Sequence, residues 1–118
     1  MTEEMEIKNM DELQNSIKVL MRNRGVKVSI KIYTNKTGNL ESRLEVKDWP
    51  YVPIFKEDSK NFHDGYAYSV RGENYKYFYD YYDLDKLLTD IYKTIIYIVS
   101  TYDSIKQREL NYTVEFEL

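Results

Sequence analysis

The sequence predicts a two-layer α+β fold, in which two helices lie on one face of an antiparallel sheet of about five strands. Apolar residues recur at helical spacing in two segments, and they alternate with polar residues in the segments between and after them. Each predicted helix and strand therefore has one apolar face, and such elements stack as two layers. The expected order is α-β-β-β-β-α-β, with a short leading strand as an option, in a single domain of residues 1–118.

Composition narrows the class of protein. The chain has 118 residues, a net charge of −3 and no cysteine, which excludes disulfide frameworks, Fe–S clusters and thiolate zinc sites. No apolar run approaches the ~18 residues that a membrane span needs, and the first residues are acidic where a signal peptide is basic. We therefore expect a cytoplasmic protein that is not specialised for phosphate backbones.

The first predicted helix follows an acidic arm, residues 1–8. Asn9 has a side chain suited to an N-cap, and Glu12 stands three residues later, as in a capping box. Apolar residues then recur at helical spacing, and Gly25 supplies the left-handed conformation that often follows a helix. We expect the helix over about residues 10–24.

A β-hairpin is predicted next. Residues 26–33 and 40–47 both alternate apolar and polar side chains, and Gly38 lies in the turn between them. Pairing Ile30 with Leu44 or with Ser42 keeps the apolar residues on one face, so both registers stay open.

Residues 49–65 are expected to form a long aromatic and proline-containing loop. Its two prolines argue against a central strand, yet Trp49, Tyr51 and Phe55 are too apolar for a solvated linker. Two interpretations stay open. The segment either folds down as a lid over one end of the core or presents these rings to a partner.

A second hairpin is rich in tyrosine. If residues 72–73 make its turn, Tyr68 faces Tyr77, and the tyrosines at alternate positions share one face. We expect the helices to cover this face, with phenol hydroxyls reaching its rim. In the alternative, tyrosines that include Tyr77, Tyr79 and Tyr81 stay exposed for recognition.

The last two predicted elements are a long helix and a strand. Asp83 caps a segment of 4-3 apolar spacing that runs without Gly or Pro to about residue 108. Residues 94–101 are β-branched and favour a strand locally, but the unbroken period on both sides decides for helix. The same spacing allows a homodimer seam. Residues 111–118 alternate again and predict a final strand.

Part of the tyrosine-rich hairpin can be compared with the first ribonucleoprotein motif of RNA-recognition domains. Four residues fit that motif: Arg71, Gly72, Tyr75 and Phe78. At the position where the motif has its first base-stacking aromatic residue, this chain has the anion Glu73. A single-stranded nucleic acid therefore remains an alternative partner. The acidic start of the second helix argues against binding to double-stranded RNA.

Catalytic and metal chemistry is indicated only weakly. Asp80, Asp83 and Asp85 do not have the spacing of an EF-hand loop, and a helix N-terminus favours acids without any metal. His63 stands beside Asp64, as a general base stands beside its orienting carboxylate, but no nucleophile or phosphate-binding motif accompanies them. We expect no enzyme activity, no metal and no cofactor.

The sequence favours a small non-enzymatic protein that binds another macromolecule. Abundant Lys, Asn, Ile and Tyr beside a single alanine indicate an AT-rich genome. We expect a phage or mobile-element protein that inhibits a host protein or nucleoprotein by stoichiometric occlusion, as anti-restriction and anti-CRISPR proteins do. An immunity protein for a cognate toxin is a further alternative. The expected partner-contacting residues are Trp49, Tyr51, Phe55, Tyr77, Tyr79 and Tyr81.

Overall fold

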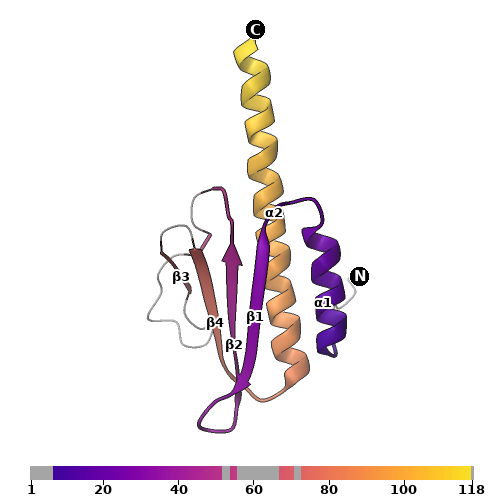
Figure 1. Cartoon of the computed structure of the whole chain (residues 1–118), viewed down its shortest axis with the longest axis vertical. Coiled ribbons are helices and arrows are strands. Elements are labelled where there is room, and N and C mark those ends of the chain that lie inside the picture. The colour runs from indigo at the N-terminus through magenta and orange to yellow at the C-terminus, as the bar shows by residue number, and fades with distance from the viewer. Residues whose placement is uncertain (1–6, 52–53, 56–66, 71–72, 118) are drawn as a thin grey trace, which may run out of the picture.

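The described part of the chain has an α+β fold of two helices and an antiparallel sheet, as predicted (Figure 1). The computed structural model describes residues 7–51, 54–55, 67–70 and 73–117, without the side chains of residues 67–70, 73 and 109–117. Its elements in chain order are α1 (Met10–Met21), β1 (Lys27–Thr34), β2 (Leu40–Lys47), β3 (Ala67–Val70), β4 (Glu73–Tyr81) and α2 (Leu84–Glu117). The predicted leading strand falls largely outside the described residues.

Helix α1 begins as predicted and ends early. Asn9 is its N-cap, and the Asn9 Oδ1 atom accepts a hydrogen bond from the backbone N–H of Glu12 at 2.9 Å. The helix ends at Met21. Arg22, its C-cap, has a non-helical ψ of 130°, and Asn23 has a left-handed φ of 66°.

Strands β1 and β2 form the predicted hairpin in one of the two registers left open by the sequence. Ile30 lies opposite Leu44. In the turn, the Asn35 Oδ1 atom accepts a hydrogen bond from the backbone N–H of Thr37 at 3.0 Å, and Gly38 has a left-handed φ of 90°. These local contacts fix the length of the turn and therefore the residues that pair.

Within the described residues, the sheet has three long strands and a short fourth, in the order β1-β2-β4-β3. In the β2–β4 pair, Ser42 lies opposite Phe78, and Arg43 lies opposite Tyr77. Directly opposite residues of an antiparallel pair share a face, so Phe78 joins the face of Leu44 while Tyr77 takes the other. Both helices lie on the Leu44 side (Figure 1).

The tyrosine-rich hairpin differs from the prediction in register and in the face that is covered. Tyr68 lies opposite Tyr75, not Tyr77, because β3 ends at Val70, which already pairs with Glu73. The shift is an even number of residues, so the alternate tyrosine positions still share one face. That face is opposite the helices, so the prediction that the helices cover it is wrong. The pairing with β2, and not the composition of β4, decides which face is covered.

The core lies between the sheet and α2. Leu44, Val46 and Phe78 supply its sheet side. Leu13 is the fully buried residue of α1, which packs against α2. The buried residues of α2 recur at helical spacing and are Leu87, Leu88, Ile91, Tyr92, Ile95, Ile98 and Val99.

Helix α2 continues well past its predicted end near residue 108. Residues 111–117 are helical, so the predicted final strand is wrong there and the five-stranded order is not confirmed. No Gly or Pro interrupts the helical period, and the helix therefore continues beyond the sheet (Figure 1). The molecule extends 60 Å along its longest axis. No helix in the described part of the chain has an apolar stretch long enough to cross a lipid bilayer.

Strand β4 has a bulge near its end. Phe78 and Tyr81 are three residues apart, whereas their partners on β2 are two residues apart. Asp80, within the bulge, has a left-handed φ of 58°. The extra residue turns Tyr81 to the helix side, where its hydroxyl donates a hydrogen bond to the Asp90 Oδ2 atom of α2 at 2.7 Å.

Asn74 ties the segment before β3 to the sheet. Its side chain is fully buried, and its Oδ1 atom accepts hydrogen bonds from the backbone N–H groups of Ile54 at 2.8 Å and Phe55 at 3.3 Å. Ser42 lies on the same face, and its buried hydroxyl has no hydrogen-bond partner in the described part of the chain.

We expect Asn74→Ala to lower the free energy of unfolding by about 1–3 kcal/mol, because two backbone N–H groups lose their acceptor. Ser42→Ala is the matched control on the neighbouring strand. It should be neutral or stabilising, because the hydroxyl that it removes has no partner to lose. Urea denaturation measures both values, and an equal loss in the two variants would contradict the role of the Asn74 amide.

Arg24 joins the α1–β1 connection to α2. Its Nε and Nη2 atoms donate hydrogen bonds to the two carboxylate oxygens of Asp103 at 3.0 and 2.8 Å. The hydrogen bond from Arg24 lowers the pKa of the Asp103 carboxyl below its ordinary value of 3.8. A carboxyl with a lowered folded-state pKa contributes stability above its unfolded-state pKa, and this is lost as the pH falls through the folded-state pKa.

Asp103→Asn is therefore expected to lower the melting temperature at pH 7 and to have no effect in strongly acidic solution. The loss at pH 7 should correspond to less than about 1 kcal/mol, because the Asp103 side chain is largely exposed. Thermal melts of the protein and of the variant between pH 7 and pH 2 make the comparison. A difference that stays constant over this range would show that the ion pair does not contribute.

Candidate functional site

One face of the sheet carries neither of the two described helices, and we call it the open face. None of its side chains is fully buried; those on β1 are exposed, and the tyrosines of β4 are half-buried. It is formed by Lys27, Ser29, Lys31, Tyr33, Glu41, Arg43, Glu45, Lys47, Tyr75, Tyr77 and Tyr79.

Arg43 stands in the middle of the open face. Its guanidinium carbon lies 4.3 Å from the centroid of the Tyr75 ring, which is a cation–π contact, and its Nη2 atom is 4.0 Å from the Glu45 carboxylate. Burial alone would lower the pKa of Arg43, but Tyr77, a hydrogen bond with Tyr75 and the charge of Glu45 together raise it. The centre of the face is therefore a permanent cation held against a phenol ring.

The tyrosines of β4 form an aromatic row beside Arg43. The rings of Tyr77 and Tyr79 are stacked, with centroids 6.0 Å apart and planes inclined by 19°. They stand two residues apart on one strand, so their rings lie on the same face. The row ends at the bulge, where Tyr81 turns to the helix side.

The corner near the β1–β2 turn is polar. Tyr33 lies opposite Glu41, and its ring is 43% exposed. Burial, followed by the charge of Glu41 and a hydrogen bond with it, raises the pKa of the Tyr33 phenol. Asn35 Nδ2 donates a hydrogen bond to Glu41 Oε2 at 3.0 Å. Tyr33 is therefore a neutral phenol near pH 7, beside a carboxylate whose position is held.

The six residues predicted to contact a partner fall into two groups. Tyr77 and Tyr79 lie on the open face. The other four lie in the core or packed against it: Trp49, Tyr51, Phe55 and Tyr81. Whether any of the six contacts a partner stays a prediction.

Trp49 closes one end of the core. It is 6% exposed, and its ring meets those of Tyr51 and Tyr102 edge to face, with centroids 5.7 and 5.8 Å away. Phe55 is 7% exposed. Of the two interpretations of this segment, the structure shows the lid for these residues.

Tyr33, Arg43 and Tyr75 were not among the six residues predicted to contact a partner. The first two stand at polar positions of strands that alternate clearly, so their common face follows from the pattern. Tyr75 joins them only through the pairing of β4 with β2, and no local pattern in the sequence shows that pairing.

The other sequence candidates do not form a site in the structure. Tyr75 lies on the open face and Phe78 in the core, so the two aromatics of the RNA-recognition pattern do not share a surface. His63 and Asp64 lie outside the described residues. Within the described residues, no group of three or more His, Cys, Asp or Glu could hold a metal ion.

No protein-family model, curated protein or solved structure matches this chain. The function of the open face is therefore inferred from its side chains. Phenol rings and a guanidinium are the groups that most often dominate binding energy at protein interfaces. Lys and Glu residues surround them and give the face both signs of charge.

The sole tryptophan allows a direct check of the core assignment. Native Trp49 should emit at blue-shifted wavelengths and shift to the red on unfolding, because its ring leaves an apolar environment. Trp49→Ala is expected to lower the free energy of unfolding by about 3–5 kcal/mol. Tyr82→Ala is the control, since Tyr82 is 82% exposed and its removal should have little effect. A native emission maximum typical of solvated tryptophan would contradict the lid.

Proposed function

We propose that this chain is a non-enzymatic binding protein that holds a protein partner on its open face. The observation that supports this proposal is the placement of tyrosines and an arginine on the sheet face that neither helix covers. Aromatic and Arg side chains bury a large area for few rotatable bonds, which makes such surfaces effective in recognition.

Each part of the face has a distinct role in this proposal. Removal of water by a partner strengthens the contact between Arg43 and Tyr75, because cation–π interactions gain energy on desolvation. The stacked rings of Tyr77 and Tyr79 offer apolar area. The hydroxyl of Tyr33 is a hydrogen-bonding group at the rim. The alternation of Lys and Glu around these groups sets the orientation of the partner.

The proposed biological role is stoichiometric inhibition by a phage or mobile-element protein. The composition, with one alanine and thirteen tyrosines, is that of an AT-rich genome. The partner would be a host protein or nucleoprotein whose working surface is covered by the open face. An immunity protein would use the same face on a cognate toxin.

A single-stranded nucleic acid fits the open face less well. The face carries Lys27, Lys31, Arg43 and Lys47, but Glu41 and Glu45 lie among these cations and their carboxylates repel phosphate. The net charge of −3 opposes such binding as well. Nucleic-acid binding is therefore an outcome of the test and not the proposal.

The test begins with a photo-reactive amino acid at position 77, which captures the partner in the organism that carries the gene. The purified complex should have a fixed stoichiometry in calorimetry. Arg43→Ala and Tyr77→Ala are each expected to weaken binding by about tenfold or more, which is about 1.4 kcal/mol.

Tyr82→Ala and Tyr97→Ala are the matched controls, because these tyrosines are 82% and 58% exposed and lie outside the open face. Both should bind as the unaltered protein does. Loss of affinity in the controls, with none in the open-face variants, would place the interface elsewhere. Salt-sensitive binding of a labelled single-stranded oligonucleotide that Tyr77→Ala abolishes would replace the protein partner with a nucleic acid.

A further inference from the structure

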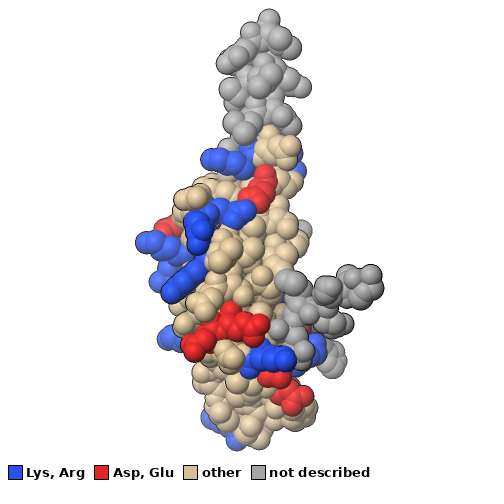
Figure 2. Space-filling model, turned by 90° about the vertical axis from the view of Figure 1, so that its right-hand side faces the viewer, with Lys and Arg blue, Asp and Glu red and all other residues tan. Residues whose placement is uncertain are grey.

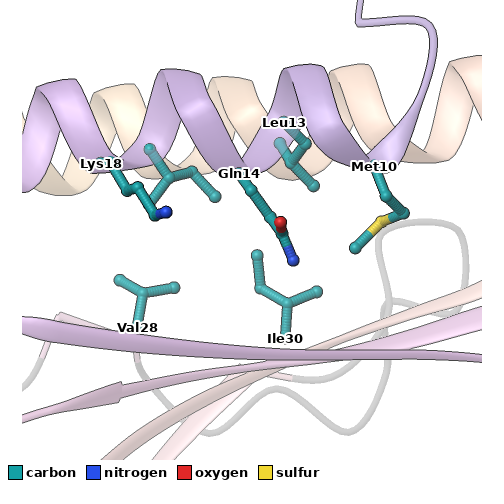
Figure 3. Close-up of a pocket in the computed structure, with 7 residues that line it drawn as sticks. Met10, Leu13, Gln14, Lys18, Val28 and Ile30 are labelled. Carbon is teal, nitrogen blue, oxygen red and sulfur yellow. The ribbon is translucent and has the colours of Figure 1, made fainter.

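A groove lies beside β1, on the side of this strand that faces α1. This strand is at the end of the sheet order, and no described strand pairs with its outer side. The groove has a volume of about 350 Å³ and lies between β1 and α1 (Figure 3). Met10 and Ile17 line it from α1, and Val28 and Ile30 line it from β1; all four are half-buried. Gln14 and Lys18 also point into the groove from α1. A sheet edge that no described strand covers, beside a largely apolar groove, is the geometry that accepts an added strand.

The position of α1 leaves room for that strand. Helix α2 packs on β2 and β4, while α1 packs on α2. Neighbouring helices lie about 8–10 Å apart, which is about two strand spacings of ~4.8 Å. Helix α1 therefore lies over the outer edge of β1 and past it, where the described sheet has no strand (Figures 1 and 3).

The charges around the groove indicate which residue types a strand added at the β1 edge would carry. Lys18 of α1 is among the residues that line the groove, and Lys27 and Lys31 are exposed on β1. Figure 2, viewed from the side of α1, shows blue side chains along the left border of the tan surface, with red side chains among and below them. A complementary strand would have apolar residues on its inner face and acidic residues on its outer face.

The C-terminal end of this chain has that pattern. Residues 112–117 alternate Tyr, Val and Phe with Thr and two Glu. Directly opposite residues of paired strands share a face. The apolar positions would therefore join Val28 and Ile30 beneath α1, and the glutamates would join the face of Lys27 and Lys31.

The same residues are weakly suited to the helix that they form here. They are the last turns of α2, which run past the sheet (Figure 1). Aromatic and β-branched residues are poorer helix formers than Ala, Leu or Glu. Glu115 and Glu117 place negative charge at the helix C-terminus, where the macrodipole opposes it. The axis of α2 carries this end away from its own groove, so it is placed to meet another molecule.

We propose that two copies of this chain exchange these segments: residues 112–117 of each copy add as a strand to the β1 edge of the other, beneath its α1. The exchange is reciprocal, so the assembly closes as a two-fold dimer. The proposal goes beyond the binding function, because the segment occupies the sheet edge and not the tyrosines of the open face.

Analytical ultracentrifugation of the full chain tests the dimer. We expect a dimer that Lys27→Glu together with Lys31→Glu weakens by about tenfold or more, and that Glu115→Lys together with Glu117→Lys restores in the same chain. Lys93→Glu with Lys106→Glu is the control, because both residues are exposed on α2 away from the groove. A monomer at every concentration would overturn the proposal. So would a dimer whose dissociation constant is the same in the charge-reversal variants as in the unaltered chain.

Disulfide trapping identifies the copy that supplies the strand, because the chain has no cysteine of its own. One tagged copy carries Ser29→Cys or Lys31→Cys, and the other carries Glu115→Cys. A disulfide between copies is expected for Glu115→Cys with either Ser29→Cys or Lys31→Cys. None is expected when Tyr82→Cys replaces the cysteine on β1. A disulfide that forms only within one chain carrying both cysteines would overturn the exchange.

Lys27 and Lys31 belong to the open face and also lie on the edge strand β1, so Tyr77→Ala is used to separate the two proposals. It should leave the dimer unchanged while it weakens binding of the partner. A dimer that depends on Tyr77 would place the contact between copies on the open face and overturn the exchange at the β1 edge. Far-UV circular dichroism confirms that each variant is folded.

Discussion

The antiparallel pairing of β2 with β4 is the constraint on which the rest of this molecule depends. Strand β2 carries Leu44 and Val46 on the side where the helices pack, and the pairing places Phe78 of β4 on that same side. Because side chains alternate along a strand, the neighbouring tyrosines of β4 then belong to the opposite face. A slip of one residue would bury phenols and expose Phe78, so the core itself holds the open face in position.

Aromatic rings are used differently on the two sides of the sheet. In the core, Trp49 meets Tyr51 and Tyr102 edge to face and fastens the segment after β2 to α2. On the open face, Arg43 lies against Tyr75 and is charged whether or not a partner is present. Groups that are already held in place lose little entropy on association, so this arrangement would suit the proposed binding of a partner.

Features that depend on neighbours in the chain could be predicted from the sequence, and those that depend on distant pairing could not. The Asn9 cap and the first hairpin follow from local chemistry, and the structure confirms them. The covered face of β4 depends on β2, and the bulge at Asp80 leaves no signal in the alternation of residues. Residues 111–117 have the alternation of a strand, but without a Gly or Pro to stop it the helix continues. In the candidate site, alternation placed Tyr77 and Tyr79 together, whereas Arg43 was overlooked among ordinary polar positions.

The single-residue bulge in β4 places Tyr79 and Tyr81 on opposite faces of the sheet, so different contacts limit substitution at the two positions. Tyr79 precedes it and lies on the open face, while Tyr81 follows it and bonds Asp90 on α2. Among descendants of this chain, substitutions at Tyr81 would be limited by the interior and accompanied by changes at Asp90. Those at Tyr79 would follow the partner if the proposed binding at the open face holds. Two tyrosines that stand two residues apart are therefore subject to different constraints, because only Tyr81 is bonded to α2.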